Sequence, residues 1–320
     1  MAEQVRDLSV YVNAPLLQSS EKPLSGNSAI ITGATRPNGI GAAIAEAFAS
    51  QGASPVILVG TSKSQELAAA VQRRLKRYNG DVYTLVGDVT KRVSCMEMME
   101  AAYDWSGGNI NILVNNAGVM SNQLVSEITE EDWDAIMRPK TLGATLMTSV
   151  WFGMRDALSI RGGRVIHIGS VIGRHGNFGQ DIYAMANSAL VGLTKSQSRE
   201  LGRRGITVNL IEPGFVEGTD MTVEFDSDQL DVIKTVTALN LLVRTQDVAA
   251  AAAFLAGPGA ERITGITLQV DSGMESNYTA PPRMHQAGFR KVPRQILSHV
   301  TGWPADLVDV IRRHGQSRNE

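Results

Sequence analysis

The feature that most constrains the fold is a regular alternation, which begins near residue 28 and continues to about residue 274. Short apolar runs alternate with longer segments whose apolar residues recur at the helical period. Parallel strands need crossover connections of this kind, so the pattern predicts one α/β domain, a doubly wound parallel sheet of seven strands with helices on both faces. The expected strands are 28–32, 55–59, 82–86, 112–115, 164–168, 207–211 and 267–270, and the expected helices are 40–51, 64–78, 94–105, 130–158, 183–202 and 247–255.

Two segments lie outside this expected domain of residues 25–275. Residues 1–24 are polar and irregular, and we expect an N-terminal arm. Residues 276–320 carry seven lysines and arginines against three acids, and they end in a short expected helix at 304–315. This basic extension is expected to pack on its own domain or on a neighbouring subunit, with a regulatory or partner-binding role as the alternative.

Charge and cysteine content narrow the class of protein. A net charge of -2 and a pI near 6.2 give no electrostatic reason to expect nucleic acid or an anionic membrane as a partner. The single cysteine, Cys95, excludes an intrachain disulfide and cannot form a thiolate metal cluster. No signal peptide and no apolar run long enough to span a bilayer is found, so we expect a cytoplasmic protein without a bound metal.

The first apolar run leads into a glycine-rich turn and then into an alanine-rich helix. Glycines at such a turn let the backbone approach a pyrophosphate, whose charge is favoured by free N–H groups and by the helix dipole. This loop predicts a dinucleotide site, and its candidate cofactor-binding residues are Gly33, Thr35, Arg36, Gly39, Ile40 and Gly41.

The end of the second run indicates which dinucleotide is bound. A site for NAD usually places an acid here to bind the ribose 2′-hydroxyl, whereas a 2′-phosphate is bound by hydroxyls and cations. The chain has Thr61, Ser62 and Lys63 at this point, with Arg36 in the glycine loop, and it has no acid. NADP(H) is therefore the expected cofactor.

The remaining motifs resemble those of the short-chain dehydrogenase/reductase family, in the family's order, from about residue 24 to residue 273. The loop from Thr32-Gly33 to Gly41 is similar to the family's cofactor loop but is two residues longer, at Pro37-Asn38. The sequence Val270-Asp271-Ser272-Gly273 resembles the family's closing motif. The resemblance implies a Rossmann-type fold, a homodimer or homotetramer, and further cofactor-binding residues, which are Asp88, Val89, Asn116, Ala117, Gly118, Tyr183, Asn187, Pro213, Gly214, Val216 and Thr219.

The resemblance also assigns catalytic roles. Ser170 stands thirteen residues before Tyr183, which is the family's spacing for the serine that holds the substrate oxygen and the tyrosine that exchanges a proton with it. In the family a lysine four residues after the tyrosine lowers the tyrosine pKa, and an asparagine in an earlier helix holds a water that serves the lysine. Here Asn187 occupies the lysine position and Lys140 occupies the asparagine position, so the two residue types are exchanged. The long stem of Lys140 gives it the reach to restore the cation near Tyr183, which would preserve the family's catalytic residue types at exchanged positions. The alternative is that Lys140 is a solvated helix cation and that the proton relay is lost; Pro139 directly before it disturbs the helix and leaves the direction of its side chain open.

Three functions are compatible with this pattern. The first is an NADPH-dependent oxidoreductase that acts on a ketone or secondary alcohol, with Tyr183, Ser170, Lys140 and Asn187 as catalytic residues. The second is a catalyst on the same fold without net redox turnover, such as an isomerase, dehydratase or cyclase, and the third is a nucleotide-binding protein without catalysis. The substrate is expected to be a hydrophobic small molecule, walled by residues 171–180 and 217–241; the second wall includes Met221, Val223 and Phe225.

Overall fold

The computed structural model describes residues 22–120, 122–219, 222 and 227–277. The N-terminal arm up to residue 21, the expected helix at 304–315, and Met221, Val223 and Phe225 of the expected substrate wall lie outside the described residues. The described residues contain no helix long and apolar enough to cross a membrane.

A seven-stranded parallel sheet forms the centre of the domain, in the order β3-β2-β1-β4-β5-β6-β7. The chain reverses its direction across the sheet between β1 and β4, which are neighbours in parallel register. This arrangement confirms the expected doubly wound α/β fold. The strands are β1 (Ala29–Thr32), β2 (Val56–Gly60), β3 (Val82–Val86), β4 (Ile112–Asn115), β5 (Gly163–Ile168), β6 (Ile206–Pro213) and β7 (Thr267–Val270).

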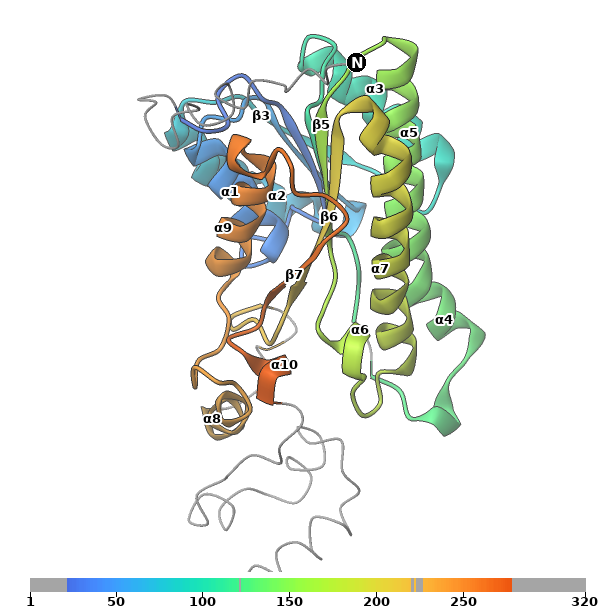
Figure 1. Cartoon of the computed structure of the whole chain (residues 1–320), viewed down its shortest axis with the longest axis vertical. Helices are drawn as coiled ribbons and strands as arrows, with labels where there is room; N and C mark the ends of the chain where they lie inside the picture. The colour runs from blue at the N-terminus through green and yellow to red at the C-terminus, as the bar shows by residue number, and fades with distance from the viewer. Residues whose placement is uncertain (1–21, 121, 220–221, 223–226, 278–320) are drawn as a thin grey trace, which may run out of the picture.

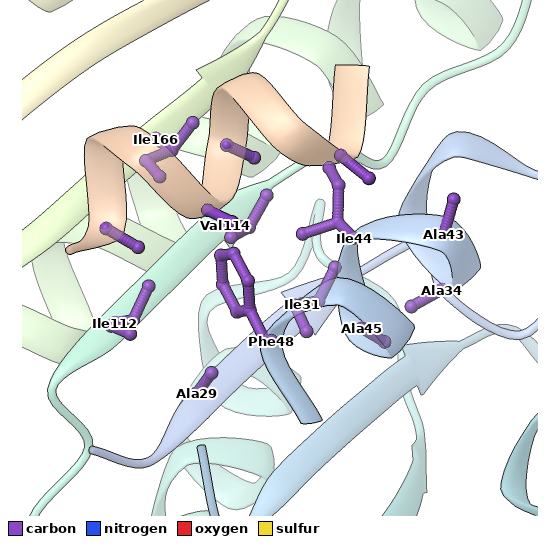
Figure 2. Packing of buried hydrophobic residues seen from close by; sticks show 14 of the residues in the cluster. Ala29, Ile31, Ala34, Ala43, Ile44, Ala45, Phe48, Ile112, Val114 and Ile166 are labelled. Carbon is purple, nitrogen blue, oxygen red and sulfur yellow. The ribbon is translucent and has the colours of Figure 1, made fainter. Parts of the chain in front are cut away.

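Helices cover both faces of the sheet (Figure 1). One face is covered by α1 (Ile40–Ser50), α2 (Gln65–Leu75) and α9 (Thr245–Ala256), and the other by α3 (Arg92–Trp105), α5 (Gly143–Ala157) and α7 (Asp181–Leu201). Figure 2 shows the core on the first face, where Phe48 and Ile44 of α1 meet Ile31, Val114 and Ile166 from three strands. Small alanines on α1 and α9 let these two helices pack closely, as the alanine-rich sequence suggested.

The helix expected over 130–158 is not continuous, and that prediction is wrong in this respect. It is divided into α4 (Glu130–Met137), a π-helical turn η5 (Arg138–Leu142) and α5. Pro139 lies in the turn and has no backbone N–H to donate, so the regular hydrogen-bond ladder cannot pass through it. The extra residue in this turn changes the direction of the side chains that follow Pro139, and Lys140 is the first of them.

Short helices missed by the sequence analysis surround the carboxyl ends of β5, β6 and β7. They are α6 (Ile172–His175), α8 (Ser227–Thr235) and α10 (Met274–Asn277), and they lie together at one end of the molecule in Figure 1. Helices of one or two turns have too few residues to display a period, which is why no pattern predicted them. The remaining short turns are η2 (Ser62–Ser64), η3 (Lys76–Tyr78), η4 (Val125–Glu127), η6 (Gly202–Arg204) and η7 (Pro258–Ala260).

Candidate active site

The expected site residues converge at the carboxyl edge of the sheet. The glycine loop follows β1, Asn116 follows β4, Ser170 follows β5, and Gly214 follows β6. In doubly wound sheets ligands bind at this edge, where the strand order reverses. The topology therefore explains why motifs spread over 180 residues of sequence form one site.

Asn116 holds the glycine loop in place. Its Nδ2 donates to the carbonyl oxygens of Thr32 and Gly33 at 2.9 and 3.0 Å, and its backbone N–H donates to Thr32 Oγ1 at 3.0 Å. A Cβ at Gly41 would lie 2.6 Å from both Asn116 Nδ2 and the Gly33 carbonyl oxygen, so no larger residue fits there. Gly33 itself has a φ of 66°, which favours glycine. The glycine loop is thus closely packed against Asn116 at the carboxyl end of β1, and its role in binding a pyrophosphate stays a prediction.

The end of β2 is joined to the glycine loop by a pair of buried hydroxyls. Thr35 Oγ1 and Ser64 Oγ are 2.7 Å apart, and Ser64 Oγ donates to the Thr61 carbonyl oxygen at 3.1 Å. The exposed side chains of Arg36, Ser62 and Lys63 are the sequence neighbours of these groups. The contact between Thr35 and Ser64 thus brings the two cation-bearing segments together at the rim of the site.

The inserted residues Pro37-Asn38 are also tethered. Arg74 of α2 donates from Nη1 to the Pro37 carbonyl oxygen at 2.9 Å, and its Nε lies 2.9 Å from Glu46 Oε2. The longer glycine loop is therefore held at two points near its middle, at Thr35 by Ser64 and at Pro37 by Arg74.

Asp88 and Val89 line the next position along the edge. Asp88 Oδ1 accepts hydrogen bonds from the backbone N–H of Thr90 at 2.9 Å and from its hydroxyl at 2.7 Å. Val89 is buried against Gly143, where a Cβ would come within 2.7 Å of the valine side chain. The turn is thus fixed by the hydrogen bonds of Asp88 within it and by the packing of Val89 on α5.

Ser170 and Tyr183 meet at the centre of the edge, as their spacing predicted. Both side chains are buried, one from the end of β5 and the other from the first turn of α7. Burial raises the pKa of Tyr183, and side-chain hydrogen bonding by Ser170 and Asn187 partly opposes that rise. The Tyr183 side chain thus lies in contact with both Ser170 and Asn187.

Asn187 lies one turn further along α7 and is completely buried. Its Nδ2 donates to the Tyr183 carbonyl oxygen at 2.7 Å, and its Oδ1 has no hydrogen-bond partner among the described residues. An unpaired buried acceptor is costly unless a ligand or another group satisfies it. A ribose hydroxyl of a bound nucleotide is a donor of the right kind for this oxygen.

Lys140 is buried in the π-helical turn. Its Nζ donates to the Ile168 carbonyl oxygen at 3.1 Å, and a Cβ at Gly118 would lie only 2.9 Å from Nζ. The ammonium thus lies between the ends of β4 and β5, in space that Gly118 leaves free. Burial lowers the pKa of Lys140 to about 8. The side chain points neither into solvent nor into a hydrogen bond with Tyr183.

Residues 213–219 leave the carboxyl end of β6 and border the candidate site there. Gly214 packs against Asp271, whose Cα would be 2.9 Å from a Cβ at that glycine. Val216 pairs with Val243 through an isolated bridge, and its carbonyl oxygen accepts a hydrogen bond from Thr219 Oγ1 at 3.1 Å. Pro213, Gly214, Val216 and Thr219 therefore form one ordered wall that leads away from β6.

The sequence analysis missed two polar residues of this site. Ser64 was overlooked although it follows directly on the three residues chosen for the phosphate. Glu212 is a fully buried acid near the end of β6, and its Oε2 accepts a hydrogen bond from Arg174 Nε. A single charged residue in a strand that otherwise carries no charge was the signal that could have identified Glu212.

Comparison with known proteins agrees with this geometry. The family model described as enoyl-(acyl carrier protein) reductase matches residues 33–275. The 3-oxoacyl-(acyl-carrier-protein) reductase of Vibrio cholerae is 40% identical over 255 residues, which cover 78% of this chain and 98% of the relative. The corresponding reductase of Escherichia coli is 39% identical over 249 residues, covering 78% and 97%.

The chain belongs to the short-chain dehydrogenase/reductase family. Solved structures of the family have the same fold. A short-chain dehydrogenase from Burkholderia cenocepacia in complex with NADP superimposes with a TM-score of 0.72 at 31% identity, covering 79% of this chain and 99% of that one. A blue fluorescent protein from a metagenomic library in complex with NADPH gives a TM-score of 0.71, also at 31% identity, with coverage of 79% and 99%.

Proposed function

We propose that this protein is an NADPH-dependent ketone reductase in which Tyr183 donates the proton and Ser170 holds the substrate oxygen. The observation that carries the proposal is the convergence of these two buried hydroxyls at the carboxyl edge of the sheet, where Asn116 also holds the glycine loop. Membership of an oxidoreductase family supports it.

The residues at the edge fit a dinucleotide with a 2′-phosphate. Gly33, Gly39 and Gly41 leave room for the pyrophosphate at the start of α1, and Arg36, Thr61, Ser62 and Lys63 offer cations and hydroxyls to the 2′-phosphate. Asp88 and Val89 would flank the adenine, the free Oδ1 of Asn187 would accept from the nicotinamide ribose, and residues 213–219 would hold the carboxamide. The nucleotide supplies the hydride when it is bound.

Proton transfer then depends on the chain's own residues. Ser170 Oγ hydrogen-bonds the substrate oxygen and orients it toward the phenol of Tyr183. Because burial raises the pKa of Tyr183, its hydroxyl is held in the protonated form that ketone reduction requires. Alcohol oxidation would need the phenolate, so we propose that reduction is the favoured direction.

Lys140 is our candidate for the cation that the family places after the tyrosine. It contributes a buried ammonium at the catalytic end of the sheet, next to the loop that contains Gly118. We propose that it favours negative charge as it develops on the substrate oxygen and on Tyr183 during turnover. Lys140 occupies a different position from the family's lysine. We therefore propose that its ammonium acts on the substrate oxygen and on Tyr183 through electrostatic attraction, without a direct hydrogen bond.

The substrate class that we propose is a 3-oxoacyl thioester or a similar hydrophobic ketone. The support comes from the relatives, which are named as 3-oxoacyl-(acyl-carrier-protein) reductases. We further propose a homodimer or homotetramer, as the family resemblance implies.

The test is NADPH oxidation by the purified protein with a 3-oxobutanoyl thioester. We expect turnover with NADPH to exceed turnover with NADH, and Tyr183→Phe and Ser170→Ala each to lower kcat by at least about 100-fold. Tyr183→Phe keeps the ring and removes only the hydroxyl, so a loss of activity in this variant would not come from lost packing. Turnover that survives Tyr183→Phe unchanged would contradict the assigned role.

A second candidate function is catalysis without net redox turnover, such as isomerisation or dehydration. One observation favours it: Lys140 binds the Ile168 carbonyl oxygen and makes no hydrogen bond to Tyr183, so the family's usual activation of the tyrosine is missing. Product formation without NADPH consumption, followed by mass spectrometry and absorbance in the same sample, would support this function over the first.

A further inference from the structure

An ion pair joins the buried carboxylate of Glu212 to the partly exposed guanidinium of Arg174, next in sequence to the candidate active-site segments. Glu212 near the end of β6 has a fully buried side chain, and Arg174 of α6 donates to its Oε2 from Nε. The other oxygen of Glu212, Oε1, has no hydrogen-bond partner among the described residues. The carboxylate therefore depends on Arg174 for the compensation of its charge.

Arg174 also reaches a third segment. Its Nη1 lies 3.5 Å from Oε1 of Glu275 in α10, and the side chains of Arg174 and Glu275 are 36% and 33% exposed. The guanidinium thus joins α6, β6 and α10, whose contributing residues are far apart in the sequence. A planar guanidinium with several fixed donors is suited to bridging two carboxylates, whereas a single ammonium is not.

The segments joined in this way carry the proposed catalytic groups. Ser170 lies four residues before Arg174, and the segment Pro213–Gly214 follows directly after Glu212. A backbone hydrogen bond of 3.1 Å from Val171 N to the Pro213 carbonyl oxygen runs parallel to the ion pair. The ion pair therefore connects the loop that carries Ser170 with residues 213–219. We call residues 213–219 the nicotinamide wall, because they are proposed to hold the nicotinamide carboxamide.

Helix α6, which carries Arg174, packs closely against α7. A Cβ at Gly173 would lie 2.8 Å from the backbone of Asn187, and Ser188 Oγ donates to the Gly173 carbonyl oxygen. Any displacement of α6 is consequently transmitted to the helix that carries Tyr183. Contacts this close leave little freedom for α6 to relax independently.

We propose that Arg174 is a positioning residue for the reaction: by binding the buried carboxylate of Glu212, it sets the placement of Ser170 relative to the nicotinamide wall and Tyr183. This inference rests on the proposed function. It assigns Arg174 and Glu212 no contact with the substrate. Misplacement of reacting groups by about 1 Å costs on the order of 100-fold in rate, so the pair is expected to affect kcat more than KM.

The experiment separates positioning from folding with a set of four variants. Arg174→Met leaves a buried carboxylate without its partner and should lower the Tm strongly. Glu212→Gln keeps an acceptor for Arg174 and should leave Tm and kcat close to those of the wild type. The double variant Arg174→Met/Glu212→Gln removes the buried charge together with the link. Glu275→Gln, at the exposed side of the same guanidinium, is the matched control and should change kcat less than about threefold.

The double variant distinguishes a positioning role of the Arg174–Glu212 pair from a role in stability alone. We expect its Tm to recover relative to Arg174→Met, while kcat with NADPH and the 3-oxobutanoyl thioester stays about 10- to 100-fold below that of the wild type and KM changes less. Recovery of kcat together with Tm would show that the pair only stabilises the fold and would overturn the proposal. If the double variant does not fold, Arg174→Lys keeps a cation beside Glu212 but loses the Nε donor that binds Glu212 Oε2; unchanged kcat in that variant would equally overturn the proposal.

A binding measurement keeps this inference distinct from the proposed function. NADPH fluorescence is titrated without substrate, and the double variant should bind NADPH several-fold more weakly than the wild type because the pair precedes the nicotinamide wall. If the wild type binds NADPH but reduces no ketone, the proposed function fails, and an NADPH affinity unchanged in the double variant would still overturn the positioning role. A wild-type protein that does not bind NADPH would overturn both.

Discussion

Asn187 donates a hydrogen bond of 2.7 Å from Nδ2 to the backbone carbonyl oxygen of Tyr183, one turn earlier in α7. The side chain that replaces the family's lysine thus donates to its own helix, and its buried Oδ1 has no hydrogen-bond partner in the part of the chain that the structure describes. An amide in this position can orient a ribose but cannot stabilise a phenolate by charge. Burial raises the pKa of Tyr183, and among the described residues only the uncharged side chains of Ser170 and Asn187 oppose that rise.

Exchanging the two residues should reverse this state of the tyrosine. The double variant Lys140→Asn/Asn187→Lys returns the ammonium to α7, where it would lower the pKa of Tyr183 by about one to two units. The phenolate fraction at pH 8 would then rise by about 10- to 100-fold, and the rate of alcohol oxidation with NADP should rise with it. The measurement is the pH dependence of oxidation, compared with that of the wild type.

The single variants serve as controls for the exchange. Asn187→Lys alone places two ammonium groups in one buried region, and we expect it to be less stable than the exchange variant. If the oxidation profiles of the exchange variant and the wild type coincide, an ammonium at position 187 does no more for Tyr183 than Lys140 does from its present place, and the raised pKa of Tyr183 would not limit oxidation.

Lys140→Met should reveal the cost of burying the ammonium. The folded-state pKa of about 8 lies below the ordinary value near 10.5, so between these values the unfolded chain binds a proton that the folded chain does not. The loss of folding stability that comes from burying the charged Lys140 is therefore complete below pH 8, and it disappears as the pH rises toward 10.5. Lowering the pH across this window should destabilise the wild type relative to Lys140→Met by about 3 kcal/mol.

Denaturant unfolding of both proteins between pH 7 and pH 10.5 measures this difference. The shape of the curve matters more than its offset, because the variant also loses the hydrogen bond to Ile168. Parallel curves for the two proteins across the window would show that Lys140 does not titrate there.

Motif spacing predicted the backbone of the site but not the directions of its side chains. Ser170, Tyr183 and Asn116 each follow a strand or begin a helix, so the doubly wound order was sufficient to bring them to one edge. The direction of Lys140 was not predictable, because the π-helical turn at Pro139 changes which way the next side chain points. The contacts of Arg174 with Glu212 and Glu275 span 38 and 101 residues, and no spacing rule relates such positions.

His167 should make stability depend on acid pH. Its ring is completely buried: Nδ1 lies 3.2 Å from Asn115 Nδ2, and Nε2 lies 3.0 Å from Gln197 Oε1. The Asn115 amide is a donor, so Nδ1 accepts and the proton resides on Nε2. Burial lowers the pKa of His167 to about 4, from an ordinary value near 6.5.

The sign follows from proton binding. Between pH 4 and 6.5 the unfolded chain binds a proton that the folded chain excludes, so stability is complete above pH 6.5 and falls as the pH is lowered toward 4. The expected loss is about 3 kcal/mol over this range. Urea unfolding from pH 7.5 to pH 4.5 should show a shallower loss in His167→Asn than in the wild type, and equal slopes would exclude His167 as the source.

Cofactor preference should reside in the two exposed cations at the rim, Arg36 and Lys63. The hydrogen bond between Thr35 and Ser64 holds their segments together, so both can reach the 2′-phosphate that distinguishes NADPH from NADH. Arg36→Ala/Lys63→Ala should weaken NADPH binding by about 10- to 100-fold, because each charge-assisted contact with a phosphate contributes about 1 kcal/mol or more at an exposed site. NADH lacks this phosphate, so its affinity should change less than about threefold.

Fluorescence titrations with the two nucleotides test this preference directly. Arg73→Ala is the matched control, because Arg73 is an exposed arginine on α2 in the neighbouring part of the surface. Its removal lowers the net charge without altering the glycine loop, and the ratio of NADPH to NADH affinity should stay as in the wild type. An equal loss of both nucleotides in Arg36→Ala/Lys63→Ala would mean that these residues support the loop as a whole, and the discrimination would then have to come from Thr61 and Ser62 at the end of β2.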